Sequence, residues 1–336
     1  MKTLINRITV PLIALLTMPD VSVFAQTSTV YATVIATKLF VVGAANPQVG
    51  LFYQGTADDT VWQHLGPNNV RASGMAVAPS TKRNTLYIAA GNGLHKSTDG
   101  GKSWRVTTGW EITEVLWASP DPRDSNVVYI ATAYGIYKTT DGCKTWKQMN
   151  AGLTSTFTPC VIADYSNPSI VYCATEDGVF GSTNGASSWQ RLGLSVSNTR
   201  IIVQHPTEPG TLAVGTENNG IYISHNSGKW WTRCEAGVDH LTFYAIAFDP
   251  NNPDVMYAGG YVTGVYKSVD AGKSWKRQND GLTSLSFHSL AVDPANSNRI
   301  YAAAIWGGVF KSDNGGTTWR KAGLGESEVW TLVIRP

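Results

Sequence analysis

Carboxylates, aromatic rings and one guanidinium occur in the loops of this chain, and they could either cleave or bind a ligand. Hydrolysis of a glycosidic bond needs two carboxyl groups about 5–10 Å apart across a cleft. The carboxylates that could form such a pair are Glu114, Glu176, Asp177, Glu217 and Glu328. Binding of a sugar or a peptide instead needs flat rings for stacking and polar groups for hydrogen bonds. The candidates for binding are Arg200, Tyr244, His288, Trp330, Tyr261, Trp306 and Tyr134.

A second set of acidic and amide side chains recurs within a short motif, which we call the box. Its pattern is Ser-x-Asp-x-Gly-x-Ser/Thr-Trp, and it is clearest at residues 97–104 and 268–275. The third position of the six copies is filled by Asp99, Asp141, Asn184, Asn226, Asp270 and Asn314. A catalytic or calcium site needs one copy, so repetition favours a structural interpretation. The carboxylate or amide can accept hydrogen bonds from turn N–H groups, and the glycine allows a positive φ.

The box belongs to a longer repeat. Seven tryptophans recur at intervals of 42–44 residues between Trp62 and Trp319, and six of them end a box. The copy that ends at Trp62 is degenerate, with Ala57-Asp58-Asp59 in place of the regular core. In the clearest copy, four strand-like segments cover residues 243–248, 255–258, 265–268 and 274–277. Four short antiparallel strands in each period are typical of a propeller blade.

The repeats predict an all-β fold, a single seven-bladed β-propeller of four-stranded antiparallel blades. We expect the first blade to take its outer three strands from about residues 39–66 and its inner strand, 329–334, from the C-terminal end. This pairing would close the ring and remove exposed sheet edges. Residues 29–37 are also strand-like, and we expect an extra outer or edge strand there. The predicted parts are a signal peptide (1–25), an extension or extra edge strand (26–38) and the propeller (39–336).

The box and the longer unit around it, Asp-Pro-x-x-Pro-x-x-x-Tyr followed by Gly-Val-Tyr-Lys-Ser, resemble the Asp-box or BNR repeat of a β-propeller superfamily. The copies look like those of xyloglucanase-like, sortilin-like and photosystem II assembly factor-like propellers. This resemblance implies the fold but no single function, because the superfamily includes sialidases, endoglucanases, receptors and assembly factors. Xyloglucanase-type enzymes place a cleft between two propellers with one catalytic Asp on each, and this chain has room for one propeller. The assembly factors are single seven-bladed secreted or lumenal propellers.

Sialidases are six-bladed and carry an arginine triad, a Tyr/Glu pair and an Arg-Ile-Pro segment early in the chain. The nearest match here, Ile334-Arg335-Pro336, stands at the wrong end and in the wrong order. The resemblance to sialidases therefore implies the repeat but not the catalytic set.

Blade topology predicts which residues share a face of the ring. The boxes and the Asp-Pro turns should lie on one face. The opposite face should carry the loops that lead into each inner strand and the turns between second and third strands. Only the second set varies among the copies, as a binding face would. Aligned inner strands predict a ring of side chains at the channel mouth: Ser73, Glu114, Pro159, Arg200, Tyr244, His288 and Trp330. A second ring comprises Asn92, Tyr134, Glu176, Asp177, Glu217, Asn218, Tyr261 and Trp306. These side chains could instead merely plug the channel and cover a solvated rim.

The charge balance and the N-terminal segment limit the possible partners and location. The chain has 26 basic and 24 acidic residues without a basic run, so no nucleic-acid partner is expected. An apolar run at residues 8–18 follows Lys2 and Arg7, and Ala25 offers a cleavage position. These features predict a Sec-type signal peptide and a secreted or periplasmic mature protein. The run is too short for a membrane span.

Cysteine and histidine usage gives no sign of a metal or cofactor. Cys160 and Cys173 lie on adjacent predicted strands, and an oxidising compartment would permit a disulfide. We favour two buried thiols, because directly opposite strand positions rarely suit disulfide geometry. The six histidines lack metal-ligand spacing, so neither a metal nor a cofactor is expected.

Two functions remain open at this stage. The leading hypothesis is an exported, monomeric, non-catalytic binding or assembly module that recognises a protein or glycan on the variable-loop face. The alternative is a xyloglucanase- or sialidase-like glycoside hydrolase with a carboxylate pair at the channel mouth.

Overall fold

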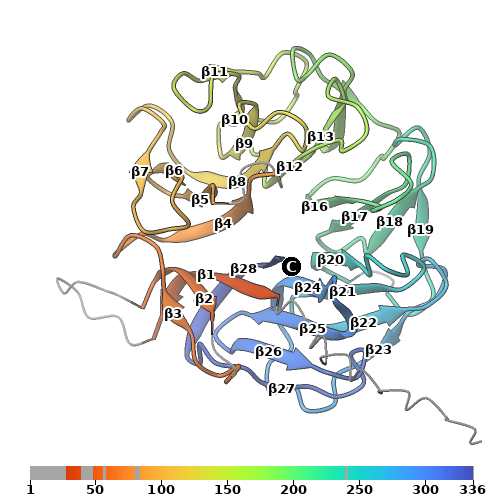
Figure 1. Ribbon diagram of the computed structural model, residues 1–336. Helices are drawn as coiled ribbons and strands as arrows, with labels where there is room; N and C mark the ends of the chain where they lie inside the picture. Colours follow the sequence, from red (N-terminus) through yellow and green to blue (C-terminus); the bar gives the residue numbers. More distant parts are fainter. Residues whose placement is uncertain (1–27, 39–47, 56–57, 80–83, 239–240, 336) are drawn as a thin grey trace, which may run out of the picture.

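The computed structural model describes residues 28–38, 48–55, 58–79, 84–238 and 241–335. Within these ranges the chain forms 28 strands and no helix, and the strands make seven four-stranded antiparallel sheets. Figure 1 shows the sheets arranged as blades around a central axis, with inner strands of successive blades in contact around the ring. The predicted seven-bladed β-propeller is confirmed. The predicted signal peptide lies outside the described residues.

The strands occupy four equivalent positions in blades 1 to 7. The inner strands are, in that order, β28 (Ser327–Arg335), β4 (Ala72–Val77), β8 (Val115–Pro120), β12 (Cys160–Ala163), β16 (Thr199–Gln204), β20 (Phe243–Phe248) and β24 (Phe287–Asp293). The second strands are β1 (Thr29–Thr37), β5 (Leu86–Ala90), β9 (Val128–Thr132), β13 (Val171–Thr175), β17 (Leu212–Thr216), β21 (Met256–Gly260) and β25 (Asn296–Ala304). The third strands are β2 (Gly50–Gln54), β6 (Gly93–Ser97), β10 (Gly135–Thr139), β14 (Gly178–Ser182), β18 (Ile221–Ser224), β22 (Gly264–Ser268) and β26 (Gly308–Ser312). The outer strands are β3 (Gln63–His64), β7 (Arg105–Val106), β11 (Lys147–Gln148), β15 (Gln190–Arg191), β19 (Thr232–Cys234), β23 (Lys276–Arg277) and β27 (Arg320–Lys321).

Blade 1 joins the two ends of the chain. The C-terminal β28 is its inner strand, as predicted, and lies beside β1 in Figure 1. The expectation of an edge strand at residues 29–37 is wrong, because β1 pairs with β28 on one side and β2 on the other. Its residues from Val30 to Val34 are all buried, so both of its faces are covered. The propeller therefore begins at β1, and not at residue 39.

The box turns are held by hydrogen bonds within the motif. In blade 2, the Asp99 carboxylate accepts from the Ser97 hydroxyl at 2.7 Å and from the Ser103 N–H at 3.0 Å. Asn boxes keep the same shape, since Asn314 Oδ1 accepts from the Thr318 N–H at 2.9 Å. In blade 6, the Ser274 hydroxyl and N–H are the main donors that lower the pKa of Asp270 to about 2. These oxygens are thus used inside their own turns.

The box turns lie beside the turns that follow the inner strands. In blade 3, the Gly142 N–H donates to Asn126 O at 3.0 Å, and the same bond recurs from Gly100 to Asn84. The loops that precede inner strands instead meet the turns between second and third strands, as where the Glu217 N–H donates to Asn198 O at 3.0 Å. The ring therefore has two faces. We call the face with the box turns the box face, and the face with the loops that precede inner strands the mouth face.

Adjacent blades are joined by a recurring tyrosine–lysine pair. In blade 3, Tyr129 and Lys138 face each other across β9 and β10, with the ammonium 5.2 Å from the ring centroid. Lys138 Nζ then donates at 2.9 Å to Gly185 O in the box of blade 4. The box tryptophan of blade 4, Trp189, donates in return to Met149 O at 2.7 Å. The same tyrosine–lysine pair occurs as Tyr87/Lys96, Tyr257/Lys267 and Tyr301/Lys311.

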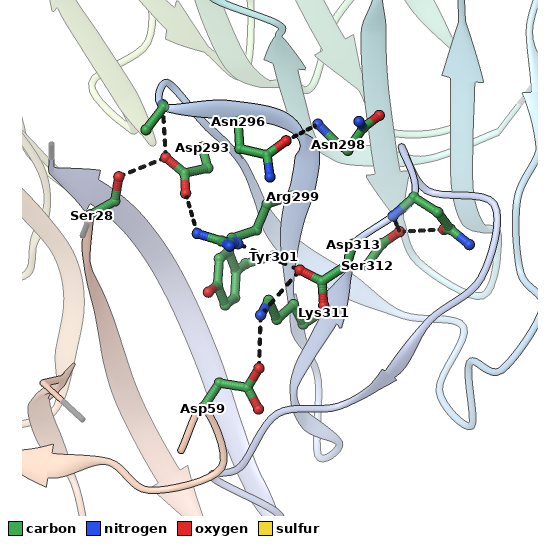
Figure 2. A network of polar contacts seen from close by, with 12 residues as sticks. Ser28, Asp59, Asp293, Asn296, Asn298, Arg299, Tyr301, Lys311, Ser312 and Asp313 are labelled. Atoms are coloured by element: carbon green, nitrogen blue, oxygen red, sulfur yellow. Dashed lines mark hydrogen bonds and ion pairs between the residues drawn. The ribbon is translucent and has the colours of Figure 1, made fainter. Parts of the chain in front are cut away.

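At the seam between blades 7 and 1 the lysine contacts carboxylates, whereas the lysines of blades 2, 3 and 6 donate to a carbonyl. Lys311 Nζ lies 2.7 Å from Asp59 Oδ2 and 3.2 Å from Asp313 Oδ1, as Figure 2 shows. The Arg320 guanidinium contacts both carboxylates, and it holds the pKa of Asp59 far below its usual range. Trp62, from the degenerate repeat, donates to Ala322 O across this seam. The degenerate copy thus supplies the anion that closes the ring.

Cys160 and Cys173, which were predicted to lie on adjacent strands, are buried free thiols. Cys160 pairs with Ala174 and Cys173 with Val161, so the two cysteines are one register step apart. Because neighbouring strand positions point to opposite faces, their sulfur atoms enter different cores. The preference for unpaired thiols is confirmed.

Candidate functional site

The mouth of the central channel holds a cavity of about 320 Å³. Its walls are Ser73, Leu116, Trp117, Phe157, Pro159, Arg200, Ile201, Glu217, Tyr244, His288, Trp330 and Thr331. Every blade contributes at least one residue to this wall. Six of the seven side chains predicted for the mouth ring lie here, and Glu114 does not.

A β-bulge at the start of the inner strand positions most of these side chains. The register between inner and second strands shifts at Ala72/Gly74, Thr199/Ile201, Phe243/Ala245 and Phe287/Ser289. The unpaired residue inside each shift is the one that lines the cavity. A bulge re-aims a side chain relative to the regular pleat, and here it turns one residue from each of these four blades into the channel.

In blade 3 the sequence alignment was wrong by two residues. The bulge lies between Val115 and Trp117, so Leu116 reaches the mouth, while Glu114 is exposed. The predicted alignment treated Pro120 as the equivalent of the prolines that follow the other inner strands. Pro120 is instead the last residue of β8. Pro122 is the equivalent of the prolines that follow the other inner strands, since Asp121 before it bonds to the turn as Asp249 does. The Asp-Pro dipeptide was the signal that would have set the register.

Three rings form a row along one side of the mouth. Tyr244 and His288 lie 5.6 Å apart between ring centroids, and His288 and Trp330 lie 4.6 Å apart. Glu328 Oε1 accepts from Trp330 Nε1 at 3.0 Å and lies 3.3 Å from His288 Nε2. The contact with His288 is the main reason why the pKa of Glu328 is lowered, so its carboxylate stays ionised. The row therefore has a fixed negative charge at one end.

The other side of the mouth carries a cation. Arg200 Nε lies 2.8 Å from Glu217 Oε1, and the guanidinium stands 5.6 Å from the centre of the Phe157 ring. The Arg200 Nε–H is not aligned with an acceptor, so the contact with Glu217 is an ion pair rather than a linear hydrogen bond. Tyr244 OH donates to the same Glu217 oxygen at 3.3 Å. Glu217 thus links the cation to the aromatic row.

The remaining predicted residues lie outside the cavity. Tyr134, Tyr261 and Trp306 are on turns between second and third strands, with 54%, 57% and 41% of their surface exposed. Glu176 and Asp177 occupy the equivalent turn of blade 4 and do not line the mouth. Of the four fallback catalytic candidates, only Glu217 reaches it. Sequence reasoning missed Leu116, Trp117 and Phe157.

The site offers stacking surfaces and charged groups but few means of proton transfer. Hydrolysis needs a carboxylic acid whose pKa is raised. Glu328 has the opposite shift. Within the described ranges, no cluster of three or more His, Cys, Asp or Glu could hold a metal ion, and no helix is suited to span a membrane.

A comparison with protein families identifies the domain. The sequence profile of the DUF6242 beta propeller domain matches residues 17–243, which is more than half of the chain. The chain belongs to the DUF6242 β-propeller domain family. No curated protein matches it significantly.

Solved structures with the same fold include a xyloglucanase, YCF48 and the extracellular domain of BT4673. The GH74 xyloglucanase from Xanthomonas campestris is 16% identical with a TM-score of 0.65, covering 85% of this chain and 52% of its own. YCF48 from Cyanidioschyzon merolae is 14% identical with a TM-score of 0.59, covering 76% of this chain and 85% of its own. The extracellular domain of BT4673 from B. thetaiotaomicron is 16% identical with a TM-score of 0.65, covering 85% of this chain and 38% of its own. The chain spans about half the length of the GH74 enzymes, including the one from Xanthomonas campestris. At these identities the likeness shows the fold alone.

Proposed function

We propose that this protein is an exported, non-catalytic binding module that takes a segment of a partner protein or a glycan into the channel mouth. The row of Tyr244, His288 and Trp330 opposite Arg200 is the observation that carries the proposal. Rings stack on sugar faces and on apolar side chains, and the charged groups orient polar atoms. Export rests on the signal-like N-terminal sequence.

The shape of the cavity favours a narrow ligand. About 320 Å³ is at the lower end of the range for small-molecule sites, so a few sugar rings or side chains would fill it. YCF48 has been solved bound to a D1 peptide, which gives this fold a precedent for peptide binding. The exposed Tyr134, Tyr261 and Trp306 would contact a larger partner around the mouth.

A glycoside hydrolase is the second candidate, favoured by Glu217 and Glu328 at one cavity and by the GH74 likeness. The lowered pKa of Glu328 argues against it as general acid. Replacing each glutamate singly with glutamine and screening glycan hydrolysis tests this candidate. Turnover by the native protein that either replacement abolishes would establish the hydrolase and overturn the non-catalytic proposal.

The binding proposal is tested by a glycan array and by a pull-down from the source organism. Arg200→Ala and Trp330→Ala should each lose the retained ligand while melting almost as the native protein does. Lys102→Ala, on the exposed box turn of blade 2, is the matched control and should retain the ligand. Unchanged binding in both mouth variants would place the site elsewhere.

A further inference from the structure

Blade 5 lacks the tyrosine–lysine pair. The positions that face each other across β17 and β18 are Ala213 and Ile223. In blade 6 the equivalent residues are Tyr257 and Lys267, which bear a phenol and an ammonium. Both substitutions in blade 5 shorten the side chain, and both remove a hydrogen-bond donor.

Ile223, the cross-strand partner of Ala213, lines a cavity of about 640 Å³ between blades 5 and 6 on the box face. Ile223, Phe248 and Met256 form its apolar wall, and Ala271 and Gly272 of the next box form its floor. His205, Glu208, His225, Asp254, Arg233 and Lys273 also line it. Its volume is twice that of the channel-mouth cavity, and its lining shares no residue with that site.

The next seam shows what would fill such a space. Tyr257 OH donates to Gly315 O at 3.1 Å, and Lys267 Nζ donates to the same oxygen at 2.8 Å. Gly315 is the fourth residue of its box, and Ala271 is the fourth residue of the box that faces blade 5. Neither Ala213 nor Ile223 has a side-chain donor for Ala271 O. The cavity therefore presents an apolar wall and a carbonyl acceptor in the arrangement that holds a phenol one blade further on.

We propose that this cavity is a second ligand site, independent of the channel mouth, and that it binds a phenol group. The ring packs against Ile223, Phe248 and Met256, and the hydroxyl donates to Ala271 O. The Met256 sulfur adds a favourable contact with an aromatic ring. The phenol comes either from a tyrosine side chain of a partner or from a free phenolic compound.

The test uses the full chain and p-cresol, observed by saturation-transfer NMR. We expect transfer to p-cresol that Ala213→Tyr abolishes, since the new side chain supplies the missing phenol in place. Ala213→Ser leaves the cavity open and should retain the signal. Should Ala213→Tyr fail to fold, Ile223→Lys provides the second variant, because its ammonium can reach Ala271 O and compete for it.

Two further probes test which chemical features of the ligand are recognised. Toluene lacks the hydroxyl and should bind more weakly than p-cresol. Tighter binding of N-acetyl-L-tyrosinamide than of p-cresol would indicate a tyrosine of a partner, and the reverse order a free phenolic compound. The proposal is overturned by absence of transfer to both phenols, by equal binding of toluene, or by transfer that survives both Ala213→Tyr and Ile223→Lys.

Discussion

The seam between blades 3 and 4 and the seam between blades 7 and 1 use the same lysine with different acceptors. Lys138 donates to the neutral carbonyl of Gly185, whereas Lys311 contacts the carboxylate of Asp59. The first pair is 47 residues apart along the chain and the second is 252. The first seam joins consecutive blades, and the second joins the two ends of the chain.

This difference places charge between segments that are far apart along the chain. Bringing distant segments together costs more loop-closure entropy than bringing near ones, so the closing seam must gain more from its contacts. Asp59 forms two ion pairs across this seam, with Lys311 and Arg320. Asp313 of blade 7 contacts the same two cations, and Figure 2 shows the contacts of Lys311 and Asp313 continuing to Arg299. The degenerate repeat therefore supplies the carboxylate that Lys311 and Arg320 contact at this seam.

Removing the closing strand should have the largest effect. A chain truncated after Glu328 loses most of β28, so the buried faces of β1, β4 and β24 become exposed. We expect cooperative unfolding at a much lower temperature, measured by circular dichroism. A melting curve like that of the full chain would show that the ring closes without β28.

Replacement of a box tryptophan comes next. Trp275 is 5% exposed and donates to Gly272 O at 3.0 Å, so Trp275→Ala should destabilise the protein by about 3–5 kcal/mol. Urea unfolding measures this loss, and ligand affinity at the channel mouth should not change. Lost affinity with full stability would mean that the box takes part in binding.

Asp59→Asn compares the two kinds of seam directly. It should cost about 1–3 kcal/mol, because Lys311 and Arg320 lose a charged acceptor in a partly buried place. The loss should shrink as salt rises, since exposed Arg320 is screened. Lys138→Met at the regular seam removes a bond to a neutral carbonyl and should cost about 1 kcal/mol with little salt dependence. Equal salt dependence would remove the distinction between the seams.

The smallest expected effect is on the stability of the protein at low pH. Folding lowers the pKa of Asp270 from 3.8 to about 2, so its carboxylate stabilises the fold above pH 3.8 and loses this contribution as the pH falls through 2. Asp270→Asn keeps the turn, as Asn314 does, but cannot titrate. The variant should lose less stability than the native protein between pH 4 and pH 2, followed by urea unfolding at each pH. Parallel profiles would show that the box carboxylates do not contribute to acid sensitivity.

The sequence was sufficient for the fold because every blade repeats its tryptophan, its glycines and its turns. It misplaced residues 29–37 because that strand carries no box, so its place between β28 and β2 depends on contacts with the far end of the chain. The strand contains Tyr31 and Thr33 between Val30, Ala32 and Val34, and alternation of this kind is also compatible with an edge.

The candidate site was predictable wherever the register was secure. Arg200, Tyr244, His288 and Trp330 precede a proline by six residues, so they aligned correctly with one another. Phe157 lies in a loop before β12, and no periodic signal connects it with Arg200. The cavity lined by Ile223 could not be predicted, because its volume follows only from the packing of two neighbouring blades.

The pairing of Thr29 with Arg335 places both ends of the ring at the same point of blade 1. β28 runs from the mouth face at Ser327 to the box face at Arg335, so the chain enters and leaves the propeller on the box face. Any tether or neighbouring domain attached at either end would hold the propeller from that side. The channel mouth would then point away from the point of attachment.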